Sequence, residues 1–151
     1  MNIAVDFLPA QKAFMEDTTR ELLYSGAFGA GETRILCEKA YWLSTFYDDN
    51  FGIILRKTLK SWRHTTLRTL LKGTGGPPVI PSDVIENHNK SEQLIRLVNG
   101  SEIIYGGLDD PDKWGSLEVA WVAIDEAVQI TEDDYIMLLG RLRQANIPFH
   151  Q

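Results

Sequence analysis

The 151-residue sequence has little that would point to an extracellular or membrane protein. Its single cysteine, Cys37, excludes an internal disulfide and fits a reducing compartment. The opening stretch "MNIAVDFLPAQKAF" has neither the basic start nor the sustained apolar run of a signal peptide. No apolar run approaches the roughly 20 residues that span a bilayer. We therefore expect a protein that has no membrane partner.

Positive charge is also scarce. The sequence holds 15 Lys and Arg against 21 Asp and Glu, which gives a net charge of -6. An acidic chain has no overall attraction to nucleic acid, so any contact with DNA would need a local basic patch. The length fits one domain with a sizeable core, and the composition is ordinary for a globular protein.

The apolar pattern predicts alternating strands and helices. The expected helices follow Pro9, run from Thr33 to about Tyr47, cover "LKSWRHTTLRTLLKG", and run from Thr131 to about Gln144. The expected strands are 22–25, "GIILRKT", Val119–Ile124 and a hairpin, "EQLIRLVNGSEIIYGG", with Asn99-Gly100 in a two-residue type I′ turn. This order predicts an α/β fold with a mainly parallel sheet flanked by helices. Ligands bind at the carboxyl ends of the strands in such sheets.

A glycine-rich loop, "YSGAFGAGETR", nearly matches the P-loop pattern G-x-x-x-x-G-K-[ST]. Gly26, Gly31 and Thr33 are in register, but Glu32 stands at the lysine position. Backbone N–H groups of such a loop surround phosphate oxygens, and the following helix adds its positive dipole. The Thr33 hydroxyl is a candidate Mg²⁺ ligand. Taken alone, the loop fits a plain strand–helix turn equally well.

A second motif favours a nucleotide site. The apolar run "VAWVAIDEA" ends in Asp125 and Glu126. In P-loop ATPases the first acid of such a pair holds Mg²⁺, and the second polarises the attacking water. The alternative is an acidic cluster at a helix N-terminus.

Several stretches together resemble the N-terminal ATPase domain of the large terminase subunit of tailed bacteriophages, the motor that packages DNA. They are "FLPAQKAF", the glycine loop, "ILRKT", "NKSEQLIRLVNGSEIIYGGLDDPDKWGSLEVAWVAIDEA" and "EDDYIMLLGRLRQ". The resemblance implies a P-loop NTPase fold of the ASCE type, with ATP and Mg²⁺ as cofactors. For a full-length relative it also implies double-stranded DNA, a portal protein and a small terminase subunit as partners. Such relatives form rings in the host cytoplasm and dock transiently on the procapsid.

The resemblance also implies residue roles. Gln11 matches the glutamine that recognises adenine, and Glu126 matches the catalytic glutamate. Thr33 and Asp125 match the metal ligands. Arg56 is a candidate for sensing the γ-phosphate or acting as an arginine finger, with Arg63 and Arg68 as alternatives. The matching nucleotide-binding positions of the loop are Gly26, Ala27, Phe28, Gly29, Ala30, Gly31, Glu32, Thr33 and Arg34.

Two departures from the family pattern matter. Glu32 sets a carboxylate against the phosphates, so we expect impaired hydrolysis. Arg34 is the nearest cation, but residues two apart on a helix face different ways. The chain also ends shortly after the Walker B helix. We therefore expect residues 1–151 to form only the N-terminal part of a terminase-like ATPase domain, without the strand between the Walker A and Walker B strands and without a nuclease domain.

Two other functions remain open. An inactive P-loop remnant would serve as a binding or interaction module. A helicase-like or chromosome-partitioning ATPase is a further alternative, against which the hairpin and the "GGLDDPDKW" loop argue.

Overall fold

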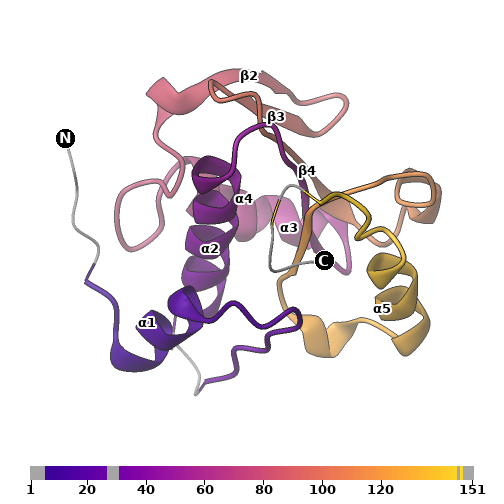
Figure 1. Ribbon diagram of the computed structural model, residues 1–151, viewed down its shortest axis with the longest axis horizontal. Helices are drawn as coiled ribbons and strands as arrows, with labels where there is room; N and C mark the ends of the chain where they lie inside the picture. Colours follow the sequence, from indigo (N-terminus) through magenta and orange to yellow (C-terminus); the bar gives the residue numbers. More distant parts are fainter. Residues whose placement is uncertain (1–5, 27–30, 146, 148–151) are drawn as a thin grey trace.

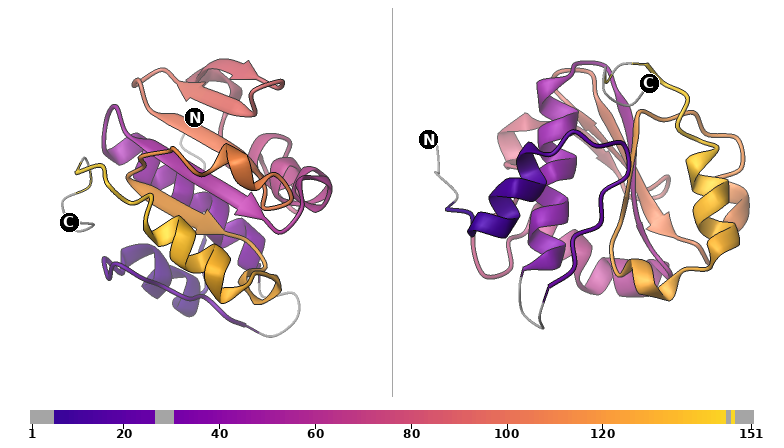
Figure 2. Two further views of the ribbon diagram at one scale, coloured as in Figure 1. Left: turned by 90° about the vertical axis from the view of Figure 1, so that its right-hand side faces the viewer. Right: turned by 60° about the horizontal axis from the view of Figure 1, so that its bottom comes forward.

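The computed structural model describes residues 6–26, 31–145 and 147. Its α-helices are α1 (Pro9–Glu16), α2 (Glu32–Phe46), α3 (Leu59–His64), α4 (Thr66–Leu71) and α5 (Glu132–Leu139). Its strands are β1 (Phe51–Arg56), β2 (Ile85–Asn89), β3 (Leu94–Leu97), β4 (Glu102–Gly107) and β5 (Trp121–Ile124). Figure 1 labels these elements, and Figure 2 shows the sheet between α1 and α2 on one face and α5 on the other.

The five strands form one sheet in the order β2-β3-β4-β1-β5. Its centre is parallel, because β1 pairs in parallel with both β4 and β5. The antiparallel strands β2 and β3 extend it at one side. Every residue of β1 after Phe51 is buried, which explains its continuous apolar run. The expected α/β class is confirmed.

The two faces of the sheet bury separate apolar clusters. Ile54 points toward α2, α3 and α4, where Trp62 stacks on Tyr105 with ring centroids 4.1 Å apart. Ile53 and its neighbours on the other face pack under α5. A β-carbon on Gly52 would lie 1.8 Å from the Trp121 ring, so this position in β1 has to be glycine.

Residues 22–25 do not form the predicted strand. They lie outside the sheet, and Leu23 is 79% exposed. A cavity of about 740 Å³ separates this segment from the outer edge of β5. The prediction was wrong because a strand needs a neighbour to accept its backbone hydrogen bonds, and β5 is not within reach.

The hairpin is present, but its turn differs from the prediction. Arg96 pairs with Glu102, and the N–H of Leu97 donates to the carbonyl of Ser101, which leaves a three-residue loop. Within this turn only Gly100 has a positive φ, 86°, whereas a type I′ turn needs two residues with positive φ. The Asn99 side chain instead donates to the Ser44 carbonyl at 2.8 Å.

Two predicted helices are shorter than expected. The helix over "LKSWRHTTLRTLLKG" is broken at Thr65, whose φ of -122° and ψ of -69° separate α3 from α4. The last helix ends at Leu139, before Gly140, rather than near Gln144. No helix in the described ranges is long and apolar enough to span a bilayer.

Candidate nucleotide site

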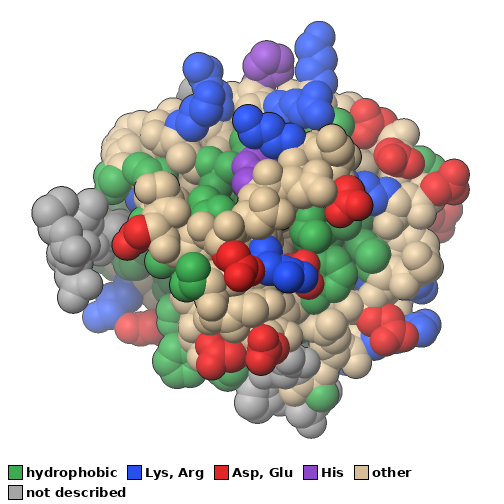
Figure 3. Space-filling view, turned by 90° about the horizontal axis from the view of Figure 1, so that it is seen from above, with side chains coloured by type: hydrophobic (Ala, Val, Ile, Leu, Met, Phe, Trp, Pro, Cys, Tyr) green, Lys and Arg blue, Asp and Glu red, His purple; other side chains and the backbone are tan. Residues whose placement is uncertain are grey.

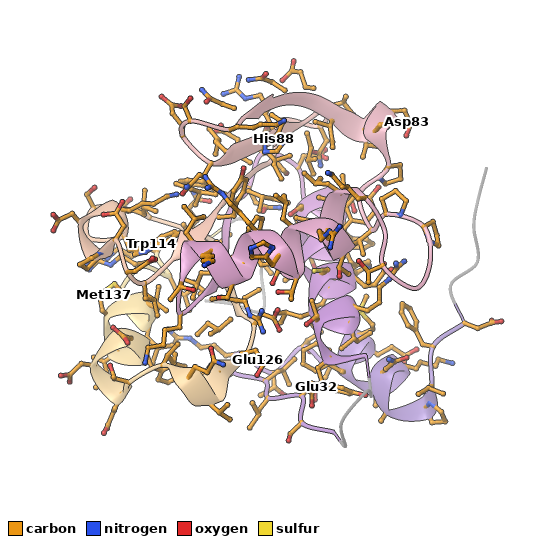
Figure 4. The ribbon with its side chains drawn as sticks, turned by 180° about the vertical axis from the view of Figure 1, so that it is seen from behind. Glu32, Asp83, His88, Trp114, Glu126 and Met137 are labelled. Atoms are coloured by element: carbon orange, nitrogen blue, oxygen red, sulfur yellow. The ribbon has the colours of Figure 1, made fainter. Side chains whose placement is uncertain are left out.

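The predicted site residues gather at the carboxyl ends of β1 and β5 and at the first turn of α2. Arg56 is the last residue of β1, and Asp125 directly follows β5. Because these two strands are parallel neighbours, their carboxyl ends meet at one edge of the sheet. Figure 4 shows Glu32 and Glu126 at the same end of the molecule. The structure thus brings together two motifs that are far apart in the sequence.

Asp125 is the most enclosed charged group of the site, with 3% exposure. Both of its carboxylate oxygens accept from the Thr33 hydroxyl at 3.1 Å. Its Oδ2 also accepts from the Thr66 hydroxyl at 2.7 Å and lies 3.5 Å from Nε of Arg56. A buried carboxylate needs such compensation, and here two hydroxyls and a guanidinium supply it.

Arg56 links the two acids. Its Nη2 lies 3.3 Å from Oε1 of Glu126, while Nη1 donates to the Ser61 carbonyl at 3.3 Å and to the Thr65 hydroxyl. The side chain is only 10% exposed. Arg56 is therefore held inside this chain, directly beside both predicted functional acids.

Glu126 follows Asp125 in an uncommon backbone conformation. Its φ of 57° and ψ of 51° lie in the left-handed region, which residues other than glycine rarely adopt. Its side chain is 38% exposed, against 4% for Asp125. The left-handed turn thus places one acid in the interior and the next one beside solvent.

Glu32 bonds back to its own loop. Its Oε1 accepts from the backbone N–H of Gly26 at 2.7 Å. N–H groups of this kind are what a glycine loop offers to a phosphate. The Glu32 carboxylate therefore accepts the N–H of the first glycine of the motif, which a phosphate oxygen would otherwise accept.

The remaining loop residues divide into three groups. Gly31 is left-handed (φ 73°), and a β-carbon there would lie 2.9 Å from Nε2 of Gln11, which places Gln11 against the loop. The Arg34 side chain forms its contacts with other residues. Its Nη2 lies 2.6 Å from Oε1 of Glu38, and its Nη1 donates to the Pro77 carbonyl at 2.6 Å. Ala27, Phe28, Gly29 and Ala30 lie outside the described residues.

Arg63 and Arg68, the alternatives to Arg56, are exposed on α3 and α4. In the described part of the chain, neither forms an ion pair or hydrogen bond with Asp125 or Glu126.

The adjacent Thr33 hydroxyl and Asp125 carboxylate fit Mg²⁺. This ion prefers oxygen ligands and usually takes one or two from the protein, the rest coming from water and substrate phosphates. The described ranges hold no group of three His, Cys, Asp or Glu side chains that would form an all-protein cage. The donor set therefore suits a metal that arrives with a nucleotide.

A family model described as phage terminase large subunit matches residues 24–151. This chain belongs to the phage terminase large subunit family. No curated protein matches it.

Solved structures show the terminase fold as well. The large terminase of the thermophilic bacteriophage D6E superposes with a TM-score of 0.72 at 14% identity, over 94% of this chain and 37% of that one. The D6E complex with ATP-γ-S gives a TM-score of 0.68 at 14% identity, over 91% and 35% of the two chains. The D6E complex with ADP gives a TM-score of 0.69 at 14% identity, over 90% of this chain and 36% of that one. This terminase chain therefore spans little more than a third of the structures that it matches.

Sequence reasoning missed the two threonines that hold the charged groups of this terminase site. Thr65 and Thr66 lie at the junction of α3 and α4 and contact Arg56 and Asp125. Their only signal was two adjacent hydroxyl residues inside a predicted helix. Such residues commonly bond to a carbonyl of their own helix, so the pattern alone does not reveal a partner elsewhere.

Proposed function

We propose that residues 1–151 form the N-terminal, ATP-binding part of a terminase ATPase domain, which in the longer protein powers DNA packaging. The contact between Thr33 and Asp125 supports this function most directly. It joins a hydroxyl at the start of the helix after the glycine loop to the carboxylate at the end of β5, the pair that a magnesium nucleotide requires. The D6E structures with ATP-γ-S and ADP agree with a nucleotide ligand.

In this proposal the chain's residues divide the work on ATP. The Gln11 amide recognises adenine, and the loop N–H groups hold the phosphates. Thr33 and Asp125 hold Mg²⁺, which when bound offsets negative charge on the phosphates. These assignments place the γ-phosphate near the carboxyl ends of β1 and β5.

Glu126 and Arg56 then act at the γ-phosphate. Glu126 orients the attacking water, because it is the more exposed of the two acids. Arg56 lies beside Glu126 within the same chain, which suits a sensor of the γ-phosphate better than a finger directed at a neighbouring subunit. Positioned charge of this kind supplies most of the catalysis in phosphoryl transfer.

Glu32 impairs hydrolysis in this proposal, because its carboxylate holds a loop N–H that the phosphates would use. The same contact favours the second candidate function, an inactive binding module. Double-stranded DNA, the portal protein, the small terminase subunit, the ring and a location in the host cytoplasm belong to the longer protein and are proposed on family membership alone.

Nucleotide binding to the chain tests the proposal. We expect Glu32→Lys to bind Mg·ATP and Mg·ADP in calorimetry. Glu32→Lys combined with Asp125→Asn, which keeps the shape of the side chain and an acceptor for the threonine hydroxyls, should lose the dependence on Mg²⁺. Glu92→Lys makes the same charge change at an exposed turn and should leave the affinity unchanged. Absence of binding by the folded Glu32→Lys variant would refute a nucleotide site.

A further inference from the structure

The surface of α3 and α4 is basic, although the protein is acidic. No Asp or Glu occurs between Asp49 and Asp83, while six of the 15 Lys and Arg do. We define the α3–α4 basic surface as the exposed side chains of Lys57, Lys60, Arg63, His64, Arg68 and Lys72. At the upper edge of Figure 3, blue Lys and Arg side chains gather around a purple histidine. Elsewhere on that face, blue basic and red acidic side chains are mixed.

The α3–α4 basic surface has no charge compensation. Some exposed basic residues elsewhere pair with acids, as Arg96 does with Glu102 at 3.3 Å and Arg143 with Glu118 at 3.7 Å. In the described part of the chain, none of the six basic side chains lies within ion-pair distance of a carboxylate. Asp109 contacts α3 at its start, through the backbone N–H of Leu59.

The spacing of these residues costs stability. Arg68 and Lys72 are four residues apart, and Lys60 and Arg63 are three apart. Like charges at these spacings face each other on a helix and destabilise it. An anion bound across the surface would relieve this repulsion.

The occupant that these features favour is the phosphate backbone of nucleic acid. The exposed large apolar side chains of the described residues lie outside α3 and α4. Protein interfaces depend on aromatic or apolar anchors at their centre, whereas phosphate contacts need only Lys, Arg and polar groups. The acidic remainder of the chain would repel DNA from the other faces.

The buried side of the same two helices holds the charged groups of the nucleotide site. At the junction of α3 and α4, the Thr65 hydroxyl accepts from Arg56 and the Thr66 hydroxyl donates to Asp125. Trp62, fully buried in the stack on Tyr105, fixes α3 to the sheet. A displacement of α3 and α4 would therefore change the hydrogen bonds of both charged groups.

We propose that the α3–α4 basic surface binds the phosphate backbone of double-stranded DNA and couples it to the nucleotide site through Thr65 and Thr66. The coupling rests on the proposed function, whereas the DNA contact does not. Because coupling is reciprocal, DNA and nucleotide each change the affinity for the other by the same factor. Thr66 is then a positioning residue that acts through Asp125.

Fluorescence anisotropy with a labelled duplex of random sequence tests the surface. The combined substitution Lys60→Ala, Arg63→Ala and Arg68→Ala should reduce the slope of log affinity against log salt by about 3, roughly one for each lost phosphate contact. The control combines Lys90→Ala, Arg96→Ala and Arg143→Ala, which removes the same charge from other elements. An equal loss in both variants, or tighter binding of polyglutamate than of DNA, would overturn the assignment.

The coupling is measured in the Glu32→Lys background as the ratio of Mg·ATP affinities with and without DNA. We expect a change of about fivefold or more. Thr66→Val should bring this ratio close to one without changing DNA affinity in the absence of nucleotide, and Thr66→Ser should restore the ratio. A ratio that Thr66→Val leaves intact refutes the coupling. If no nucleotide binds, the proposed function and the coupling both fail, while the anisotropy result stands by itself.

Discussion

Replacing Glu32 tests whether the loop's own carboxylate blocks the phosphate site. Its hydrogen bond from the Gly26 N–H, 2.7 Å long, must break before a phosphate can use that donor. A hydrogen bond to a charged group contributes about 1.5–3 kcal/mol, and each 1.4 kcal/mol changes an equilibrium constant about tenfold. Glu32→Ala should therefore raise ATP affinity by about 10- to 100-fold.

Repulsion between charges adds to this effect. Two unit charges about 4 Å apart near a protein surface interact by roughly 4 kcal/mol before screening by solvent and salt. Glu32→Gln removes the charge but keeps a neutral acceptor, so its affinity should fall between those of the wild type and Glu32→Ala. Glu32→Lys reverses the charge and should bind ATP most tightly of the series.

Calorimetry with Mg·ATP gives the affinities, and phosphate release gives the rates. The wild type should hydrolyse ATP at the background rate, since losing one transition-state contact already costs about 10²–10³-fold. Glu92→Ala, Glu92→Gln and Glu92→Lys form the matched control series. Wild-type turnover of about one per second or faster, or equal affinities across the Glu32 series, would refute the reasoning.

Three further predictions concern catalysis, pH and the sheet edge. In the Glu32→Lys background, Glu126→Gln should abolish turnover but keep nucleotide bound, and an unchanged rate would show that Glu126 does not orient water. Burial lowers the pKa of Lys113 from 10.5 to about 8, so the unfolded chain holds this proton at pH values where the folded one does not. Stability should therefore rise between about pH 8 and 10.5, and Lys113→Met should flatten that rise in urea titrations. The open edge of β5 should give a melting temperature below about 60 °C for the monomer, and a cooperative transition above it would contradict this.

The sequence predicts the parts of the site that depend on local pattern. Helix α2 was expected over Thr33–Tyr47 and runs over Glu32–Phe46, because its apolar residues recur at helical spacing. Strands β1 and β5 follow from short buried apolar runs, and the acids after β5 mark its carboxyl end. These elements are enough to bring Thr33 and Asp125 together, since parallel neighbouring strands end at the same edge.

The parts that depend on a distant partner were not predictable. Residues 22–25 have the composition of a strand, yet strand formation requires a neighbour, and the cavity beside β5 separates them from one. The break at Thr65 has no local signal, because nothing near it in the sequence specifies Arg56 and Asp125 as partners. Likewise, the pair Asn99-Gly100 predicts a turn. It does not predict the hydrogen bond from the Asn99 side chain to the Ser44 carbonyl, which accompanies the longer loop.

The burial of Asp125 decides how the role of Arg56 has to be tested. Asp125 is 3% exposed, and Arg56 is the positive charge beside it. Removing one partner of a buried ion pair costs about 3–5 kcal/mol, a large part of a domain's stability of about 5–15 kcal/mol. Arg56→Ala would therefore lose activity through unfolding whether or not Arg56 acts on the γ-phosphate. Arg56→Lys keeps the charge but lacks the planar fork that reaches Asp125 and Glu126 together. In the Glu32→Lys background, a loss of turnover by Arg56→Lys at an unchanged melting temperature would assign Arg56 to catalysis, whereas parallel losses of both would assign it to stability.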